Sequence, residues 1–208
     1  MKKFFCPIAV ILALLPLTLS AQEFNPVRGP LEGVWKIEDE ELIIFTGNLM
    51  LHKNIWSSSY DITPGIVYEN GKAFGPAESN ETPTEYEVMF NYELSENALK
   101  IIVEGDELIC PKSPDDILQN KGPLEGIWTG TISDSDTTET LIWIIIGELL
   151  IEATETDSYT NYGGALEFIY SDLDNTLTAL GEAISCAVSG DTMTITNDFQ
   201  TVVLTRGK

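Results

Sequence analysis

The stretch Gly29-Pro30-Leu31-Glu32-Gly33-Val34-Trp35 occurs twice in this chain. The second copy reads Gly122-Pro123-Leu124-Glu125-Gly126-Ile127-Trp128, so that only Val34 is changed, and it begins 93 residues after the first. Each copy opens a segment of similar length, 29–113 and 122–208, and residues 114–121 connect the two segments. The repeat therefore predicts one structural unit used twice in tandem.

Residues 1–21 have the pattern of a secretory signal peptide, and residues 22–28 form a short lead-in. The chain begins Met1-Lys2-Lys3, continues with an uncharged run over residues 4–19, and ends this run in small residues. A retained membrane anchor is the alternative, but the run is shorter than the ~20 apolar residues that span a bilayer. Cys6 precedes the apolar run, so there is no lipobox. The pattern predicts a secreted or periplasmic protein without a stable membrane span.

The composition is strongly acidic, with 33 Asp and Glu against 11 Lys and Arg and a formal net charge of −22. A field of this sign repels nucleic acids and anionic lipid surfaces, so neither is expected as a partner. The same charge favours solubility, cationic partners and divalent cations. The alternative is that the negative charge only keeps an exported protein soluble. The charge therefore does not identify a partner.

Both segments show the two-residue periodicity of strands that are buried on one face. In the clearest case Tyr86, Val88, Phe90, Tyr92 and Leu94 alternate with mostly polar residues, which predicts that these five side chains point inward. Sustained helical periodicity is absent from the sequence after the signal peptide. The expected fold is all-β, with loops at 56–64, 75–84 and 154–164.

One predicted strand, residues 141–146, is apolar on both faces. One face can meet the core of the second unit, whereas the face with Ile142, Ile144 and Ile146 needs another covering surface. This pattern predicts that the two units pack together through these isoleucines. In the connecting segment, Ile117-Leu118 is expected to form a helical turn that docks between the units.

Each unit also ends with a long cationic side chain. Residues 108–112 align with residues 202–206 at a spacing of 94, which places Lys112 over Arg206. A Gly-x-Trp start and a cation on the last strand resemble the lipocalin-like barrels of the calycin group. The resemblance implies two tandem small antiparallel up-and-down barrels, in which Trp35 pairs with Lys112 and Trp128 with Arg206 at the closed end. Such an indole–cation pair contributes about 0.5–2 kcal/mol.

The resemblance implies a binding protein for a small apolar or amphipathic molecule, without catalysis. An eight-stranded barrel has an interior that either holds one small ligand or is filled by side chains. Tyr86, Phe90 and Tyr92 are the candidate ligand contacts, although filling the core is the more economical role for them. The alternative is a protein-interaction or structural module of a bacterial envelope, with filled barrels, that binds another protein through its loops or acidic surface.

Few residues suggest other chemistry. Cys110 and Cys186 could form a disulfide or remain buried thiols, and His52, the single histidine, is expected on an exposed face. No spacing typical of a transition-metal site or a catalytic triad is found, so no metal, cofactor or enzymatic activity is expected. Acidic turns at residues 134–139 and 172–175 lack the spacing of a calcium loop and are interpreted as solvated turns.

Overall fold

A computed structural model describes residues 27–37, 41–54, 56–76, 86–114, 117–119, 122–133, 138–155, 160–197 and 200–207. These residues form strands and turns without any helix, which confirms the all-β prediction. The signal peptide, most of the lead-in and most of the loop expected at 75–84 lie outside the described residues. The chain divides into unit 1, Met1–Trp56 with Asp61–Pro114, and unit 2, Ser57–Tyr60 with Asp115–Lys208.

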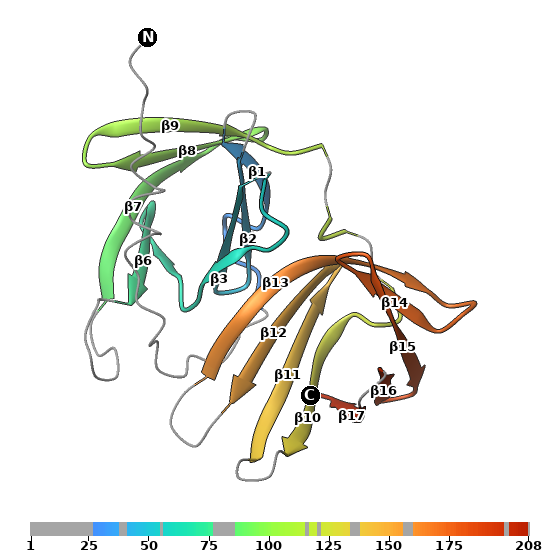
Figure 1. Ribbon diagram of the computed structural model, residues 1–208. Coiled ribbons are helices and arrows are strands. Elements are labelled where there is room, and N and C mark those ends of the chain that lie inside the picture. Colours follow the sequence, from blue (N-terminus) through green and yellow to red (C-terminus); the bar gives the residue numbers. More distant parts are fainter. Residues whose placement is uncertain are drawn as a thin grey trace. The chain divides into compact units, whose positions relative to one another are not determined.

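Unit 2 is a closed antiparallel barrel whose eight strands follow one another in sequence order (Figure 1). The strands are β10 (Gly126–Ser133), β11 (Thr138–Ile146), β12 (Leu149–Glu155), β13 (Thr160–Ser171), β14 (Thr176–Ala179), β15 (Glu182–Ser189), β16 (Thr192–Thr196) and β17 (Thr201–Arg206). The barrel closes where Trp128 pairs with Arg206 and Thr129 with Thr205. An up-and-down meander of this kind leaves no unpaired sheet edge along the closing strands.

A glycine makes this closure possible. A Cβ atom added to Gly130 of β10 would lie 2.5 Å from the carbonyl oxygen of Val203 on β17, closer than a real Cβ atom can approach. On the same seam the Gly207 amide donates to the Ile127 carbonyl at 2.7 Å. The first and last strands therefore meet closely because position 130 has no side chain.

Unit 1 has two sheets, one with the order β1-β2-β3-β4 and one with the order β5-β6-β7-β8-β9. The strands are β1 (Gly33–Ile37), β2 (Glu41–Thr46), β3 (Leu49–Asn54), β4 (Asp61–Thr63), β5 (Val67–Glu69), β6 (Lys72–Pro76), β7 (Tyr86–Leu94), β8 (Ala98–Val103) and β9 (Asp106–Pro111). All neighbouring pairs are antiparallel. One hydrophobic core, from Leu31 to Cys110, draws on both sheets.

The break between the two sheets has a local cause. Pro64 has no amide proton for a sheet ladder, and Gly65 has φ of 77°, in the left-handed region that glycine prefers. Unit 2 has one continuous strand, β13, at the corresponding place. Even so, the Ile66 amide donates to the Asn48 carbonyl at 2.8 Å, as the Phe168 amide does to Glu148 at 2.9 Å. The two units thus share a chain path although β4 and β5 are separate strands.

The other junction between the sheets of unit 1 repeats the seam of unit 2 in reduced form. Trp35 and Lys112 form an isolated antiparallel bridge, and the Ser113 amide donates to the Val34 carbonyl at 2.8 Å. These contacts are equivalent to Trp128 with Arg206 and to Gly207 with Ile127. In the described residues this seam is one bridge wide, compared with two paired positions in unit 2.

The predicted inward face of residues 86–94 is wrong at both ends. Phe90 is buried and Tyr92 packs against the core, but Tyr86, Val88 and Leu94 are exposed. The register shifts between Ala73 and Phe74, so that an extra residue, Met89, bulges inward against the core. Beyond the bulge the alternation reverses, and Tyr86 points away from the core at 37% exposure.

On β11, Trp143 and Ile145 belong to the core of unit 2, as alternation predicts. On the other face Ile144 is 1% exposed, and Ile142 and Ile146 are half-buried. The packing of the units through these isoleucines stays a prediction.

The prediction of a helical turn at Ile117-Leu118 is wrong, because the segment is a non-helical turn, which contacts the turn between β11 and β12. The Ile117 carbonyl accepts a hydrogen bond from the Glu148 amide at 2.8 Å. Gly147 admits this approach, since a Cβ atom there would overlap Ile117.

Unit 2 also takes in a segment from far earlier in the chain. The Tyr60 amide donates to the Ala165 carbonyl at 2.9 Å, which forms an isolated antiparallel bridge to β13. The Tyr60 hydroxyl donates to Glu167 at 2.5 Å. The segment Ser57–Tyr60 therefore extends the pairing of β13 and interrupts the path of unit 1 between β3 and β4.

Candidate functional site

The repeated motif makes the same contacts in both units. The indole N–H of Trp35 donates to the Leu31 carbonyl at 2.9 Å, and that of Trp128 donates to the Leu124 carbonyl at 2.7 Å. Both tryptophans are buried. A buried indole needs such a partner, because an unpaired N–H in a core costs about 1–3 kcal/mol. The spacing of four residues between Leu and Trp is thus a structural requirement.

The glutamate of the motif holds the hairpin that follows it. The Glu32 carboxylate accepts hydrogen bonds from the Gly47 amide and the Thr46 hydroxyl, both at 3.1 Å. In unit 2, Glu125 accepts from the Gly147 amide at 2.9 Å. The motif therefore ties the start of each unit to the turn of its first hairpin, and its repetition reflects structure.

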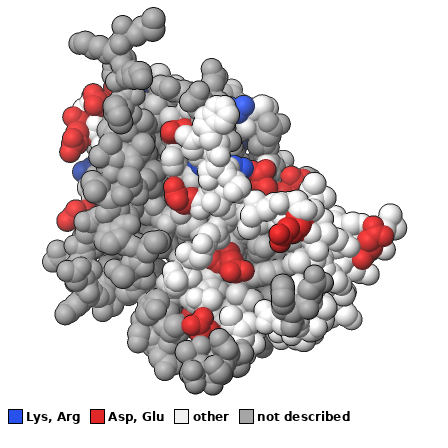
Figure 2. Space-filling model, viewed as in Figure 1, with Lys and Arg blue, Asp and Glu red and all other residues white. Residues whose placement is uncertain are grey.

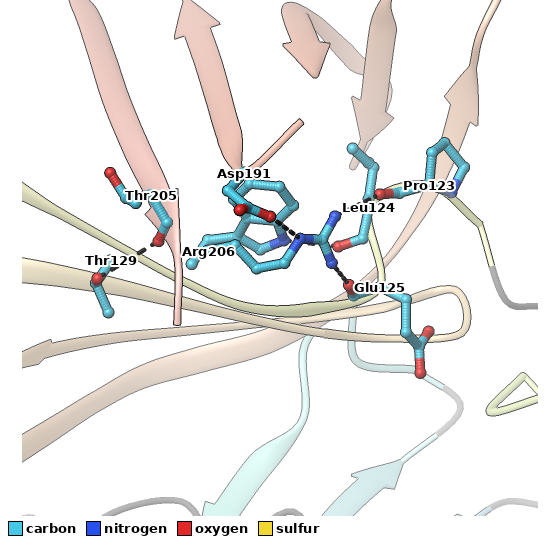
Figure 3. A network of polar contacts seen from close by, with 8 residues as sticks. Pro123, Leu124, Glu125, Thr129, Asp191, Thr205 and Arg206 are labelled. Carbon is cyan, nitrogen blue, oxygen red and sulfur yellow. Dashed lines mark hydrogen bonds and ion pairs between the residues drawn. The ribbon is translucent and has the colours of Figure 1, made fainter. Parts of the chain in front are cut away.

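The cation of the last strand completes this end of unit 2. The Arg206 guanidinium carbon lies 4.1 Å from the centre of the Trp128 ring, and its nitrogens donate to the carbonyls of Pro123, at 3.0 Å, and Glu125 (Figure 3). Asp191 lies 3.9 Å from the guanidinium Nε. Arg206 thus satisfies carbonyl groups that precede β10 and covers the indole at the same time.

Lys112 occupies the equivalent place in unit 1. It pairs with Trp35, and its Cε atom lies 3.7 Å from where a Cβ atom of Gly33 would be. The four residues of the expected Trp–cation pairs therefore meet in their own units, with Lys112 beside Trp35 and Arg206 over Trp128. These groups serve the packing of the motif end, so a ligand site has to be sought at other positions.

A second polar group lies on the core face of the β1–β4 sheet. Directly opposed residues of antiparallel strands point to the same face. Ile43 and Met50 belong to the core, so their row partners His52, opposite Ile43, and Thr63, opposite Met50, face the core too. Asp61 lies opposite His52, and Glu41 lies two residues before Ile43 on the same face of β2.

His52 is 7% exposed, which corrects the expectation of an exposed histidine. Its Nε2 atom lies 3.1 Å from Glu41 Oε2. The expectation failed because the other face of β3, with Leu49 and Leu51, is also buried, so alternation no longer distinguishes core from surface. Within the described residues no group of three or more His, Cys, Asp or Glu is arranged to hold a metal ion.

Two hydroxyl groups in unit 1 are buried without a protein partner. They are Thr63 Oγ1, on a side chain that is 3% exposed, and Tyr68 Oη on β5. Tyr68 packs edge-on against Phe45 and Tyr92, which places its ring in the core. Burial, followed by the nearby charge of Glu32, raises the pKa of Tyr68 above its usual value. Among the described residues these are the two unpartnered buried side-chain groups, and both lie in unit 1.

The equivalent core face of unit 2 is less polar. The register places Leu141, Glu152, Gly164 and Leu166 where unit 1 has Glu41, His52, Asp61 and Thr63. Its one charged member, Glu152, accepts a hydrogen bond from the indole N–H of Trp143 at 3.1 Å.

Deeper in unit 2 the core positions are apolar. Leu177, Cys186, Met193 and Leu204, from four successive strands, are each at most 1% exposed. These inward positions of the barrel are apolar and buried, as are most core positions of unit 1, whereas the buried polar positions of the described residues are concentrated in unit 1.

The expected ligand contacts do not share one surface. Phe90 is buried in the core of unit 1 and contacts Phe45, with ring centres 6.0 Å apart. Tyr92 is half-buried beside Tyr68, and Tyr86 is exposed beyond the bulge. Only Phe90 and Tyr92 thus line the same interior as Thr63 and His52.

The cysteines and the outer charges add no further site. Cys110 and Cys186 are buried in the cores of different units and are not joined in a disulfide. On the face drawn in Figure 2 the described Asp and Glu side chains are spread as separate groups and few Lys or Arg side chains are visible. In the described part of the chain no helix is long and apolar enough to cross a membrane.

Sequence reasoning missed the core-facing positions of Thr63 and Tyr68. Thr63 precedes a proline in a stretch that reads as an irregular loop, and Tyr68 lies in a strand of three residues. The sequence repeat could have revealed the position of Thr63. Aligning β2–β4 with β11–β13 places Thr63 at the position of Leu166, opposite a core residue of the neighbouring strand.

Comparison with known proteins gives no match, either to a family model, to a curated protein or to a solved structure. The fold itself defines the class of this chain. It is an all-β protein with a closed eight-stranded antiparallel barrel in its second unit and two antiparallel sheets around one core in its first.

Proposed function

We propose that the chain is an exported lipocalin-like binding protein of two tandem small barrels, and that unit 1 binds a small amphipathic molecule. The observation that carries this proposal is the pair of buried hydroxyls, Thr63 and Tyr68, which have no protein partner in the core of unit 1. Native cores rarely leave such groups unpaired, because each costs about 1–3 kcal/mol. A ligand that pairs them would offset this cost.

The comparison between the units supports a functional origin of these polar groups. Unit 2 has Leu166 in the place of Thr63 and Leu141 in the place of Glu41, so the same framework accepts apolar residues there. Polar residues at core positions lower stability when they lack partners. The presence of Glu41 and Thr63 in unit 1, where unit 2 has leucines, is expected if they serve binding, with Phe90 and Tyr92 contacting the apolar part of the ligand.

In this proposal unit 1 is a barrel of the same plan as unit 2, with its fourth strand broken at Pro64 and Gly65. The shared seam contacts of Trp35 with Lys112 and of Ser113 with Val34 support that plan. The protein is secreted or periplasmic, it acts without catalysis, and its second barrel serves as a filled structural partner.

Native mass spectrometry of the mature chain with decanol tests this function. We expect one bound molecule per chain for the native protein and weaker binding for Thr63→Val, which removes the hydroxyl at nearly constant shape. Thr196→Val is the matched control, because it makes the same change on an exposed position of unit 2. If neither decanol nor a copurified molecule binds to the folded protein, the hydroxyls are satisfied by internal water and the proposal fails.

The alternative function is a protein-interaction module with filled barrels. The exposed apolar residues of unit 2, Ile169 at 74% and Leu173 at 95% exposure, favour it. A pull-down from envelope extract with the native chain and with an Ile169→Ser, Leu173→Ser variant tests this alternative. A partner retained by the native chain and lost by the variant would support it, and equal recovery by both would contradict it.

A further inference from the structure

We propose that the ligand of unit 1 carries an ammonium group, so that the protein binds amphipathic amines in preference to alcohols or fatty acids. This inference rests on the proposed binding function and specifies the chemistry of the same site. It starts from three residues on the core-side face of the β1–β4 sheet near Thr63, namely His52, which is buried, Glu41, which is half-buried, and Asp61, which is exposed. The carboxylates of Glu41 and Asp61, when ionised, can only accept hydrogen bonds. The hydroxyl of Thr63 can donate one hydrogen bond and accept others.

The first observation is the sign of the charge on this core face. Glu41 and Asp61 flank His52, with Glu41 Oε2 at 3.1 Å from His52 Nε2 and Asp61 directly opposite His52 in the register. Opposed side chains in a sheet have Cβ atoms about 5 Å apart. Glu41 on β2 and Asp61 on β4 lie on either side of His52 on β3, so a ligand in contact with His52 meets one carboxylate on each side.

The second observation is the position of the lysines of the sheets. They are Lys36 on β1, Lys53 on β3, Lys72 on β6 and Lys100 on β8. Each is the chain neighbour of a residue that faces the core, so its side chain points to the opposite face of the sheet. Lys100 forms ion pairs with Glu93 and Glu107 on that outer surface. Lys112 reaches the core side, but at the motif end beside Trp35. The strands thus direct their lysines away from the core face that carries Glu41 and Asp61.

The third observation points to a ligand independently of charge. Thr63 is two residues from Asp61 on the same face of β4, it is 3% exposed, and its hydroxyl has no protein partner. An ammonium group has three N–H donors and no acceptor. Thr63 and Asp61, two residues apart on one face of β4, offer acceptors for such a group, while Ile43 and Met50 of the same sheet face offer apolar contacts for the rest of the molecule.

A carboxylate ligand is disfavoured by the same geometry. Its charge would face Glu41 and Asp61, and like charges at short distance in a partly buried site repel strongly. The net charge of −22 acts in the same direction at longer range. A neutral alcohol can pair with Thr63 but leaves the carboxylates without a cation.

The test compares decylamine, decanol and decanoate, which have equal chain lengths, by isothermal titration of the mature chain at neutral pH. We expect decylamine to bind at least about tenfold more tightly than decanol, and decanoate to bind most weakly. Asp61→Asn and Glu41→Gln are expected to weaken decylamine binding severalfold and to leave decanol binding unchanged. Glu69→Gln is the charge-matched control, because Glu69 follows the core-facing Tyr68 and therefore lies on the outer face of its sheet.

The outcomes separate this inference from the proposed function. Equal binding of all three probes, or preference for decanoate, overturns the amine while the binding function stands. Binding of none of them by the folded protein removes the binding function itself. Decylamine binding that disappears at about 0.5 M salt and does not respond to Asp61→Asn is surface attraction by an acidic protein, which also overturns the inference.

Discussion

Arg206 shows how a single side chain can serve several groups at once. It covers the Trp128 ring at 4.1 Å and donates to carbonyls of Pro123 and Glu125, which lie outside the sheet ladder. Because the guanidinium is planar and has five donors, a lysine cannot replace all of these contacts. Position 206 is therefore expected to matter more for stability than its exposure suggests.

Arg206→Ala is predicted to lower the free energy of unfolding by about 1–2 kcal/mol, since it removes the cation–π contact and leaves carbonyls without their donor. Arg206→Lys should lose part of this amount. Urea unfolding followed by tryptophan fluorescence measures both. A change within about 0.3 kcal/mol for Arg206→Ala would mean that water replaces the guanidinium at no cost.

Thr63→Val should have the opposite sign. The hydroxyl of Thr63 is buried without a partner, so its removal is predicted to raise the free energy of unfolding by about 0.5–1 kcal/mol in the absence of ligand. The same urea titration checks this value, with Thr196→Val as control. A loss of stability would show that an internal water pairs the hydroxyl well in the free protein.

At the scale of elements, the closing strands of unit 2 depend on the absence of one side chain. Gly130→Ala would place a methyl group against the backbone of Val203 and the side chain of Leu204, and the backbone oxygen cannot rotate away. We predict a loss of about 1–3 kcal/mol from this overpacking. Faster hydrogen exchange of the Gly207 amide, which donates to Ile127 across the seam, reports the local opening.

Gly122→Ala is the matched control for this prediction, because a Cβ atom at Gly122 meets nothing within 4 Å. Equal stability of the two variants would contradict the assignment of Gly130 as a close-approach residue.

The sequence predicts the strands of this protein better than the directions of their side chains. The repeat and the two-residue periodicity were enough to predict all-β units that begin at Gly29 and Gly122. The bulge at Met89 could not be foreseen, because one extra residue reverses the pattern without a change in composition, and Tyr86 was assigned to the wrong face. His52 was misplaced because β3 is buried on both faces, where alternation carries no information.

At the scale of the whole molecule, burial predicts a response to alkaline pH. Burial raises the pKa of Cys186 from 9.0 to about 11 and that of Tyr162 from 10.0 to about 12. In the unfolded chain these groups lose their protons at lower pH than in the folded protein. Their contribution to stability is therefore complete below pH 9 and is lost as the pH rises from 9 to about 12.

Thermal melts between pH 8 and 12 measure this loss. Cys186→Ala and Tyr162→Phe should each flatten the decline, Cys186→Ala from pH 9 to about 11 and Tyr162→Phe from pH 10 to about 12. A decline of unchanged steepness in both variants would assign the alkaline sensitivity to other groups.

The bridge from Tyr60 to Ala165 has a consequence for the order in which the chain acquires its structure. The segment Ser57–Tyr60 lies between β3 and β4, yet its pairing partner is β13, about a hundred residues later in the chain. Contacts of such sequence separation form slowly, because a long loop has to close first. As the chain emerges, β1 to β3 can pair at once, whereas Tyr60 has no strand to join until β13 has appeared. The strand β13, which is synthesised late, is thus the pairing partner of a segment that is synthesised early. Folding therefore does not proceed strictly from the first residue to the last.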